Sequence, residues 1–288
     1  MRRTGSVVEV PTPADGPLVA LLDLVLPTPC AGCADPVARL CVACAGRFAR
    51  PRLHTVPDLP PVIVLASYAG PPRATVLAYK ERGRRDLAVP LAAHAAAALA
   101  LAGPGATGPG ERGWLLVPAP SRAPAARARG GDHMLRLARA VARAPEGSGG
   151  AGSGVVVPAL ALRRGARDSV GLDADARAAN LRRHMRVRPG GARRLRAAPS
   201  APVVLLDDVL TTGATARAAL ALLGAVGVVL DAILVLTAVP GGPAGPGVAL
   251  RPTTARGVPI SGDPPLERSV HPSGVSDCAR LPRVHGAR

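Results

Sequence analysis

Aromatic side chains are nearly absent from this sequence of 288 residues. Phenylalanine, tyrosine and tryptophan together make up 1% of the chain, so a core must be built mainly from alanine, valine and leucine. Proteins that bind single-stranded nucleic acid without sequence preference usually stack the bases on aromatic side chains. The shortage of aromatic residues therefore argues against binding of that kind.

Long uninterrupted apolar runs are also lacking. Residues 1–16 mix arginines, acids, prolines and glycines before any apolar run, which does not fit a secretory signal peptide. The longest apolar stretch, Leu87–Ala102, contains Pro90 and His94 and is shorter than the about 20 residues of a membrane-spanning helix. We therefore expect a cytoplasmic protein without a membrane span.

Lysine is scarce as well, because Lys80 is the only one, yet the formal net charge is +17. All the other basic residues counted in that charge are arginines. A bias towards arginine, alanine, glycine and proline is typical of proteins from GC-rich genomes and explains part of the charge. The remainder is consistent with attraction to polyanions such as nucleic acid or phosphorylated small molecules.

Apolar runs alternate with helical patterns between residues 60 and 240. Strands are predicted at 62–67, 114–117, 155–157, 203–206 and 232–239, and helices at 72–82, 87–102, 132–143, 173–183 and 214–225. This alternation is typical of an α/β domain with a mostly parallel sheet flanked by helices. Residues 20–55 are assigned to a small N-terminal module. Residues 241–288, rich in proline, glycine, serine and arginine, are assigned to a disordered basic tail.

The clearest motif lies at residues 203–215, where an apolar run leads into two carboxylates and a threonine-rich turn. Asp207 and Asp208 could accept hydrogen bonds from two sugar hydroxyls, or hold them through Mg²⁺. The following residues offer hydroxyls, backbone amides and a helix N-terminus to a phosphate, and they are Thr211, Thr212, Gly213, Ala214 and Thr215. The alternative is a buried strand followed by an ordinary capped helix. No Gly-Lys-Ser/Thr follows, so the motif is not a Walker A loop.

Four cysteines form a second motif with the spacing C-x2-C-x7-C-x2-C: Cys30, Cys33, Cys41 and Cys44. Two such pairs are typical of a structural zinc site, in which four thiolates surround the ion and leave no open position. The alternatives are two disulfides or four unrelated cysteines, and disulfides are disfavoured without a secretion signal. The fifth cysteine, Cys278, lies in the predicted tail and is assigned no role.

The 203–215 motif resembles the signature with which type I phosphoribosyltransferases bind phosphoribosyl pyrophosphate (PRPP). Together with the cysteine motif it resembles the ComF family, which is linked with DNA uptake in competent bacteria; the resemblance covers about residues 20–240. Supporting segments are Tyr68-Ala-Gly with Leu77-Ala78-Tyr79-Lys80, residues 117–120 with 127–131, and Arg177-Ala178-Ala179-Asn180.

The resemblance implies a type I phosphoribosyltransferase-like fold that binds PRPP with Mg²⁺ and carries a structural zinc ion. Asp207 and Asp208 would then be the catalytic carboxylates. The pyrophosphate would lie near Ala119, Pro120 and Ser121, with Arg127, Arg129 and Lys80 as candidate cations.

Three functions remain open at this stage. The first is an enzyme, a glycosyltransferase that moves a phosphoribosyl group to an acceptor that the sequence does not identify. The second is a non-enzymatic module that binds single- or double-stranded DNA, or the competence machinery, through its arginine-rich segment 163–196. The third is a regulator that senses PRPP without turnover. The histidines at 54, 94, 133 and 184 are expected to be surface or core residues, and no Ser-His-Asp arrangement is expected.

Overall fold

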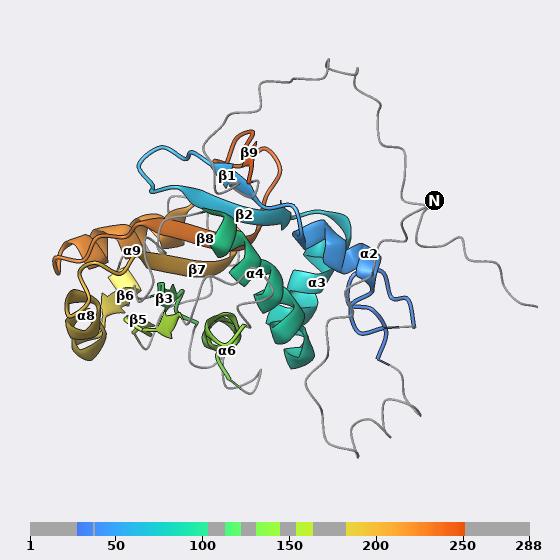
Figure 1. Cartoon of the computed structure of the whole chain (residues 1–288), viewed down its shortest axis with the longest axis horizontal. Coiled ribbons are helices and arrows are strands. Elements are labelled where there is room, and N and C mark those ends of the chain that lie inside the picture. Colours follow the sequence, from blue (N-terminus) through green and yellow to red (C-terminus); the bar gives the residue numbers. More distant parts are fainter. Residues whose placement is uncertain are drawn as a thin grey trace, which may run out of the picture.

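A mostly parallel sheet of seven strands forms the centre of the molecule (Figure 1). The computed structural model describes residues 28–36, 38–102, 113–121, 131–144, 154–163 and 183–250. The strands lie in the order β4 (Val155–Val156), β3 (Leu115–Pro118), β7 (Val203–Leu210), β8 (Ala232–Ala238), β2 (Val62–Ser67), β1 (Arg52–His54) and β9 (Val248–Ala249). Neighbours from β4 to β2 are parallel, whereas β1 runs antiparallel to both β2 and β9. The predicted α/β class with a mostly parallel sheet is confirmed.

Helices cover both faces of this sheet (Figure 1). Their bounds are α2 Val42–Ala45, α3 Gly70–Glu81, α4 Ala88–Ala102, α6 His133–Ala142, α8 Pro189–Arg196 and α9 Ala214–Gly224. One core lies between the sheet and α3, α4 and α6, and the other lies between the opposite face and α9 and α8. A separate antiparallel pair joins β5 (Leu160–Leu162) to β6 (Met185–Val187).

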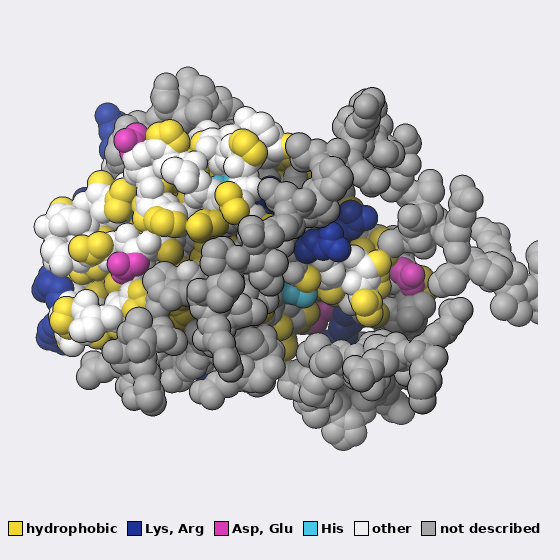
Figure 2. Space-filling model, turned by 45° about the horizontal axis from the view of Figure 1, so that its top comes forward, with side chains coloured by type: hydrophobic (Ala, Val, Ile, Leu, Met, Phe, Trp, Pro, Cys, Tyr) yellow, Lys and Arg dark blue, Asp and Glu magenta, His cyan; other side chains and the backbone are white. Residues whose placement is uncertain are grey.

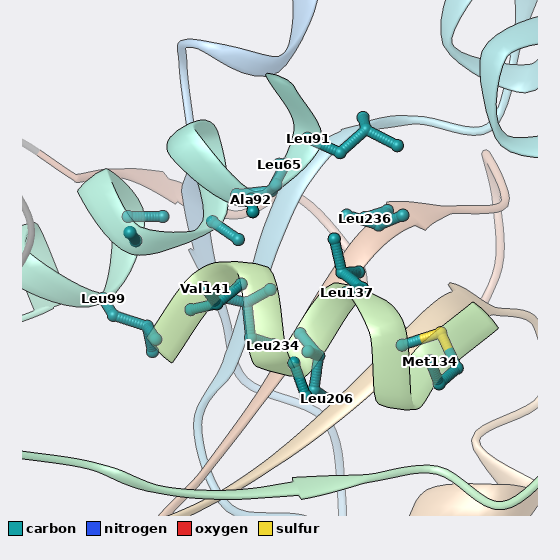
Figure 3. Close-up of a cluster of buried hydrophobic side chains, with 14 of the residues drawn as sticks. Leu65, Leu91, Ala92, Leu99, Met134, Leu137, Val141, Leu206, Leu234 and Leu236 are labelled. Atoms are coloured by element: carbon teal, nitrogen blue, oxygen red, sulfur yellow. The ribbon is translucent and has the colours of Figure 1, made fainter. Parts of the chain in front are cut away.

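Side-chain alternation along β7 assigns its residues to the two cores. Val204 and Leu206 belong to the core under α4 and α6, whereas Val203 and Leu205 belong to the core under α9. Figure 3 shows Leu206 and Leu234 of the sheet among Leu137 and Val141 of α6 and residues of α4. Because successive strand residues point to opposite faces, Asp208 faces the α6 side and Asp207 the α9 side.

Judged by length and apolar composition alone, one helical segment in the described part of the chain, Arg85–Ala102, could cross a membrane. The expectation that this stretch is too short is therefore wrong, because the 3-10 turn Arg85–Leu87 precedes α4 and lengthens the helical segment. The fully buried side chains of Leu87 and Leu91 pack in the core together with Leu99. One face of the helix thus packs in the core, and 44% of the segment is buried.

Both ends of the predicted domain differ from the expected boundaries. Strand β1 lies inside the segment assigned to the N-terminal module, yet it pairs with β2 of the central sheet. Residues 241–250, assigned to a disordered tail, carry β9 and pair with β1. Both strands are too short to give a periodic pattern in the sequence. β1 pairs with nearby β2, whereas β9 is placed by pairing with β1 across about 190 residues of chain. Residues 173–182 of the predicted helix and residues 251–288 lie outside the described residues.

Candidate functional site

The threonine-rich turn lies between the carboxyl end of β7 and the N-terminus of α9. Gly213 is the N-cap residue of α9 with φ of 77°, and no side chain of the described residues caps the first turn. The first amides of a helix have no partner within the helix, so the α9 N-terminus presents free donors and a positive potential to an anion. The surrounding cavity measures about 70 Å³ and is lined by Asp207, Thr211, Thr212, Gly213, Ala214 and Thr215, among others. We call it the loop cavity.

Asp207 is the acid of the loop cavity. Its side chain is half-buried, and its Oδ1 accepts a hydrogen bond from the backbone amide of Asp208 at 2.9 Å. Burial, followed by repulsion from the Asp208 carboxylate, raises the pKa of Asp207 to about 7, although Lys80 acts in the opposite direction. A carboxyl group held in this way favours a cation or a hydrogen-bond donor in the loop cavity.

Asp208 points to the other face of the sheet and is almost completely buried. Its carboxylate accepts hydrogen bonds from Lys80 Nζ at 2.9 Å and from His133 Nε2 at 3.0 Å. Burial by itself would raise the pKa of Asp208, but the hydrogen bond from His133 and the charge of Lys80 lower it. Burial by itself would lower the pKa of Lys80, but the Asp208 charge outweighs it and raises that pKa above its ordinary value. The structure thus brings Lys80 to Asp208, on the opposite side of the strand from the loop cavity.

His133 extends this network to the loop after β3. Its Nδ1 lies 3.3 Å from Ser121 Oγ, and Ser121 Oγ donates to Asp132 Oδ1 at 3.0 Å. The Tyr79 hydroxyl donates to the backbone oxygen of His133 at 2.6 Å. The predicted capping of α6 by Asp132 is confirmed, because its Oδ1 accepts from the amides of Met134 and Leu135. A continuous line of polar contacts therefore joins Ser121 to Asp208.

Ser121, His133 and Asp208 lie in one line of polar contacts, although the sequence predicted no Ser-His-Asp arrangement. Local patterns could not reveal it, since Asp208 lies 75 residues from His133 in the sequence. The arrangement does not match a hydrolytic triad, because the Ser121 hydroxyl donates to Asp132, which already caps α6. The line instead fixes the positions of the loop after β3 and of the Asp208 carboxylate.

The loop after β3 lies beside the end of β7. Pro118 pairs with Leu206 in the parallel register, and the Ala119 amide donates to Leu206 O at 2.8 Å. Ala119 is buried, and Pro120 and Ser121 are half-buried next to it. The predicted residues 119–121 and the 207–215 motif therefore meet at the carboxyl edge of the sheet, where ligands bind in open α/β folds. Arg127 and Arg129 lie outside the described residues.

The four predicted metal-binding cysteines come together near the start of the described chain. Their Sγ atoms lie within 4.8 Å of one another, and those of Cys33 and Cys41 are 3.7 Å apart. A tetrahedral ion with Zn–S bonds of about 2.3 Å separates its sulfurs by about 3.8 Å. All four thiols are free, which contradicts the alternative of two disulfides. The cluster can hold a metal ion and is compatible with structural zinc.

Burial and backbone amides shape the charge of this cluster. Burial alone would raise the pKa of the Cys30 thiol, but amides led by that of Cys41, 3.3 Å from its Sγ, lower it to about 7. Burial raises the pKa of Cys44, and the neighbouring thiols raise it further. Ionising all four cysteines together is therefore unfavourable without a cation to stabilise the thiolates.

Arg84 attaches the cluster to the rest of the molecule. Its guanidinium donates to the carbonyls of Pro29 and Arg39 at 3.0 and 3.1 Å and pairs with Asp86 at 2.8 Å. Phe48, which follows the cluster, is fully buried in the central core. The cysteine segment is thus continuous with the main fold.

Replacing Gly213 with alanine is expected to destabilise the protein by about 1–2 kcal/mol, because alanine adopts a positive φ only with strain. The added Cβ would lie 3.0 Å from the Arg217 guanidinium, which donates to Thr212 O. Urea unfolding measures the effect. Gly224→Ala at the other end of α9 is the matched control, because an added Cβ there meets no atom within 4 Å. Equal stabilities of the two variants would contradict the expectation.

Comparison of the sequence with protein-family models and with curated proteins gives no match.

Proposed function

We propose that the protein binds PRPP at the loop cavity, as a phosphoribosyltransferase-type protein of the ComF kind. The observation that carries the proposal is the joint position of Asp207, three threonines and an uncapped helix N-terminus around one cavity. Carboxylate, hydroxyls and amides are the groups that recognise a ribose phosphate with its accompanying Mg²⁺. The four-cysteine cluster supports the same proposal, because this combination underlies the resemblance to ComF proteins.

In the proposed role, each element of the site has a distinct task. The amides at the start of α9 and the hydroxyls of Thr211, Thr212 and Thr215 would bind the 5-phosphate. The loop at Ala119–Ser121 would face the pyrophosphate, and the Asp207 carboxylate supplies an oxygen ligand suited to Mg²⁺. If transfer occurs, a nucleophile bonds to the ribose C1 as the C1–oxygen bond to pyrophosphate breaks, and the nucleophile loses its proton.

The proposal is tested by thermal unfolding with and without PRPP and Mg²⁺. A ligand at about 100 times its Kd stabilises the folded state by about 2.7 kcal/mol, which raises Tm by about 5–10 °C for a domain of this size. Thr215→Val should reduce the affinity for PRPP about tenfold or more, because a hydrogen bond to a charged group is lost. Thr55→Val, at an exposed position just after β1, is the matched control. No shift with millimolar PRPP in the wild-type protein would reject the proposal.

Pyrophosphate release separates an enzyme from a sensor. A transferase should release pyrophosphate from PRPP only when an acceptor is added, whereas a sensor should bind PRPP and release none. Screening acceptors against the PRPP-bound protein therefore decides between the two. We propose a cytoplasmic location in either case, and the four free cysteines are compatible with a reducing compartment.

DNA binding is the second candidate function, and exposed arginines on and next to β6 and α8 favour it. The exposed set is Arg183, Arg186, Arg188, Arg193, Arg194 and Arg196. Binding through phosphates should weaken steeply with salt and depend little on sequence. Replacing Arg193 and Arg194 with alanine should reduce the slope of log affinity against log salt by about 2.

The matched control for this measurement is alanine at Arg139 and Arg143, which are also exposed but lie on and just after α6. Fluorescence anisotropy with duplex and single-stranded oligonucleotides gives both slopes. Absence of binding at low salt, or equal slopes for the two double variants, would reject DNA binding through this surface.

A further inference from the structure

A second, larger cavity of about 510 Å³ lies at the carboxyl ends of β2 and β8. Its walls come from the segment 47–54 on one side and from the loop between β8 and β9 on the other, with Val64 and Leu65 among the lining residues. Its volume is within the range of about 300–1,000 Å³ that small-molecule sites occupy. We call it the arginine cavity.

Among the described residues that line the arginine cavity, the charged side chains are all arginines: Arg47, Arg50 and Arg52. Within the described part of the chain, the guanidinium groups of Arg47 and Arg50 make no hydrogen bond or ion pair. Figure 2 shows acidic side chains only singly on the described part of the face it presents. Two guanidinium groups without a carboxylate partner, at the rim of a cavity, favour an oxyanion as the occupant.

The frame of this cavity is held in place by hydrogen bonds. Arg52 donates from Nη2 to the carbonyl of Gly247, and His54 Nδ1 contacts the carbonyls of Ala244 and Gly245. Gly247 lies so close to His54 that an added Cβ would be 2.5 Å from the ring. The loop between β8 and β9 is therefore hydrogen-bonded to β1, and the cavity is preformed.

The two cavities adjoin each other. Leu210 lines the loop cavity and Ala238 lines the arginine cavity, and these residues pair in the parallel register of β7 and β8. A Cβ added to Gly242, which lines the arginine cavity, would lie 3.3 Å from the backbone oxygen of Thr211. A single layer of backbone thus separates them at this point.

We propose that the arginine cavity binds the second ligand of this site, a small molecule carrying a carboxylate or phosphate group. The identity of the ligand as a second substrate rests on the proposed function of the loop cavity, whereas anion binding by the arginines does not. The described lining residues include no aromatic ring except that of His54, so they offer little for stacking on a planar base. Guanidinium groups recognise carboxylate and phosphate in the same forked geometry, so the two sources need separate probes.

Arginine footprinting on the full chain tests anion binding. The protein is treated with phenylglyoxal, which modifies guanidinium groups, with and without citrate or inorganic phosphate, and mass spectrometry follows each arginine. Arg47 and Arg50 should be protected by citrate, by phosphate or by both, whereas exposed Arg139 and Arg143 should react equally in all samples. If neither citrate nor phosphate changes the modification rate of Arg47 or Arg50, the proposal is overturned.

Calorimetric titration of the effective probe provides the second measurement. Arg47→Gln with Arg50→Gln should weaken binding about tenfold or more, because charge-assisted hydrogen bonds are lost. Arg139→Gln with Arg143→Gln should leave binding unchanged. A single substitution, Arg50→Gln, keeps the test decisive if the double variant does not fold. Unchanged affinity in folded Arg50→Gln and in the folded double variant would overturn the proposal.

PRPP separates failure of this inference from failure of the proposed function. Stabilisation by PRPP without protection of Arg47 and Arg50 would reject the arginine cavity and leave the proposed function standing. If a probe protects Arg47 and Arg50 but PRPP does not stabilise the protein, the cavity is an anion site and its role as the site of a second substrate is rejected. Tighter binding of the probe when PRPP is present would support both.

Discussion

Asp207→Asn is expected to make the ligand-free protein more stable at pH 8 while abolishing its response to PRPP. The physical reason is the raised pKa of Asp207, which reflects burial and the nearby Asp208 carboxylate. Asparagine keeps the shape of the side chain and removes the charge that these surroundings disfavour. At pH 8 the gain should be on the order of 2 kcal/mol, allowing for the partial exposure of the side chain.

The pH dependence of this gain has a definite direction. The pKa of Asp207 rises from its ordinary value of 3.8 to about 7 in the folded protein. Between these values the unfolded chain has lost the proton and the folded chain retains it, so wild-type stability falls as the pH rises from about 4 to about 7. The advantage of Asp207→Asn should therefore be small at pH 4, grow through pH 5–7 and be complete at pH 8.

Asp208→Asn should have the opposite effect. The pKa of Asp208 is lowered, so its carboxylate contributes stability that is fully present above about pH 4 and is lost only as the pH falls through the folded-state pKa. Asparagine would leave Lys80 without its ionic partner and weaken the contact with His133. We expect a loss of about 2–3 kcal/mol that is already complete at pH 5.

Urea unfolding between pH 4 and pH 8 measures both effects, and PRPP titration gives the loss of binding. Asp58→Asn is the matched control, because Asp58 is exposed at a φ of 60° that asparagine also tolerates. If Asp207→Asn and Asp208→Asn shift stability in the same direction at pH 8, the assignment of the two carboxylates to different surroundings is wrong. Retention of normal PRPP binding by Asp207→Asn would remove Asp207 from the proposed site.

The different surroundings of these two acids show where sequence reasoning succeeded and where it failed. The apolar run 203–206 predicted a buried strand, and the threonine-rich segment predicted the start of a helix, as the structure has them. The strand, however, continues to Leu210. Ending it at residue 206 treated Asp207 and Asp208 as neighbouring loop residues that share one ligand. Extending the strand by four residues places them on opposite faces, because side chains alternate along a strand.

Contacts over long distances in the sequence account for most of what the sequence did not predict. Lys80 is 128 residues from Asp208, and no local pattern indicates that pair. The short strands β1 and β9 contain too few residues for a recognisable alternation. The arginine cavity, which β1 and the loop before β9 line, was therefore not predicted either. By contrast, the C-x2-C-x7-C-x2-C spacing predicted the cysteine cluster, because two close pairs on one short segment leave little freedom in how they meet.

That proximity leads to a prediction about metal removal. Cys44→Ser should abolish zinc binding and lower the free energy of unfolding by about 4 kcal/mol or more, which is the range typical of losing a structural metal. Cys44 is buried, and an added Cβ on Gly32 would lie 2.7 Å from its Sγ, so the cluster packs tightly around this thiol. Metal analysis of the purified protein and thermal unfolding with and without a chelator provide the measurements.

The effect should extend beyond the cysteine segment. Phe48 and the partly buried Ala31 and Leu40 contribute to the core beneath α4, and Arg84 joins Pro29 and Arg39 to the turn before that helix. Loss of the metal should therefore lower Tm in one transition for the whole domain. Cys278→Ser, outside the cluster, should keep the zinc content and Tm of the wild-type protein. A wild-type protein that contains no metal, with Cys44→Ser and Cys278→Ser equally stable, would reject the structural zinc site.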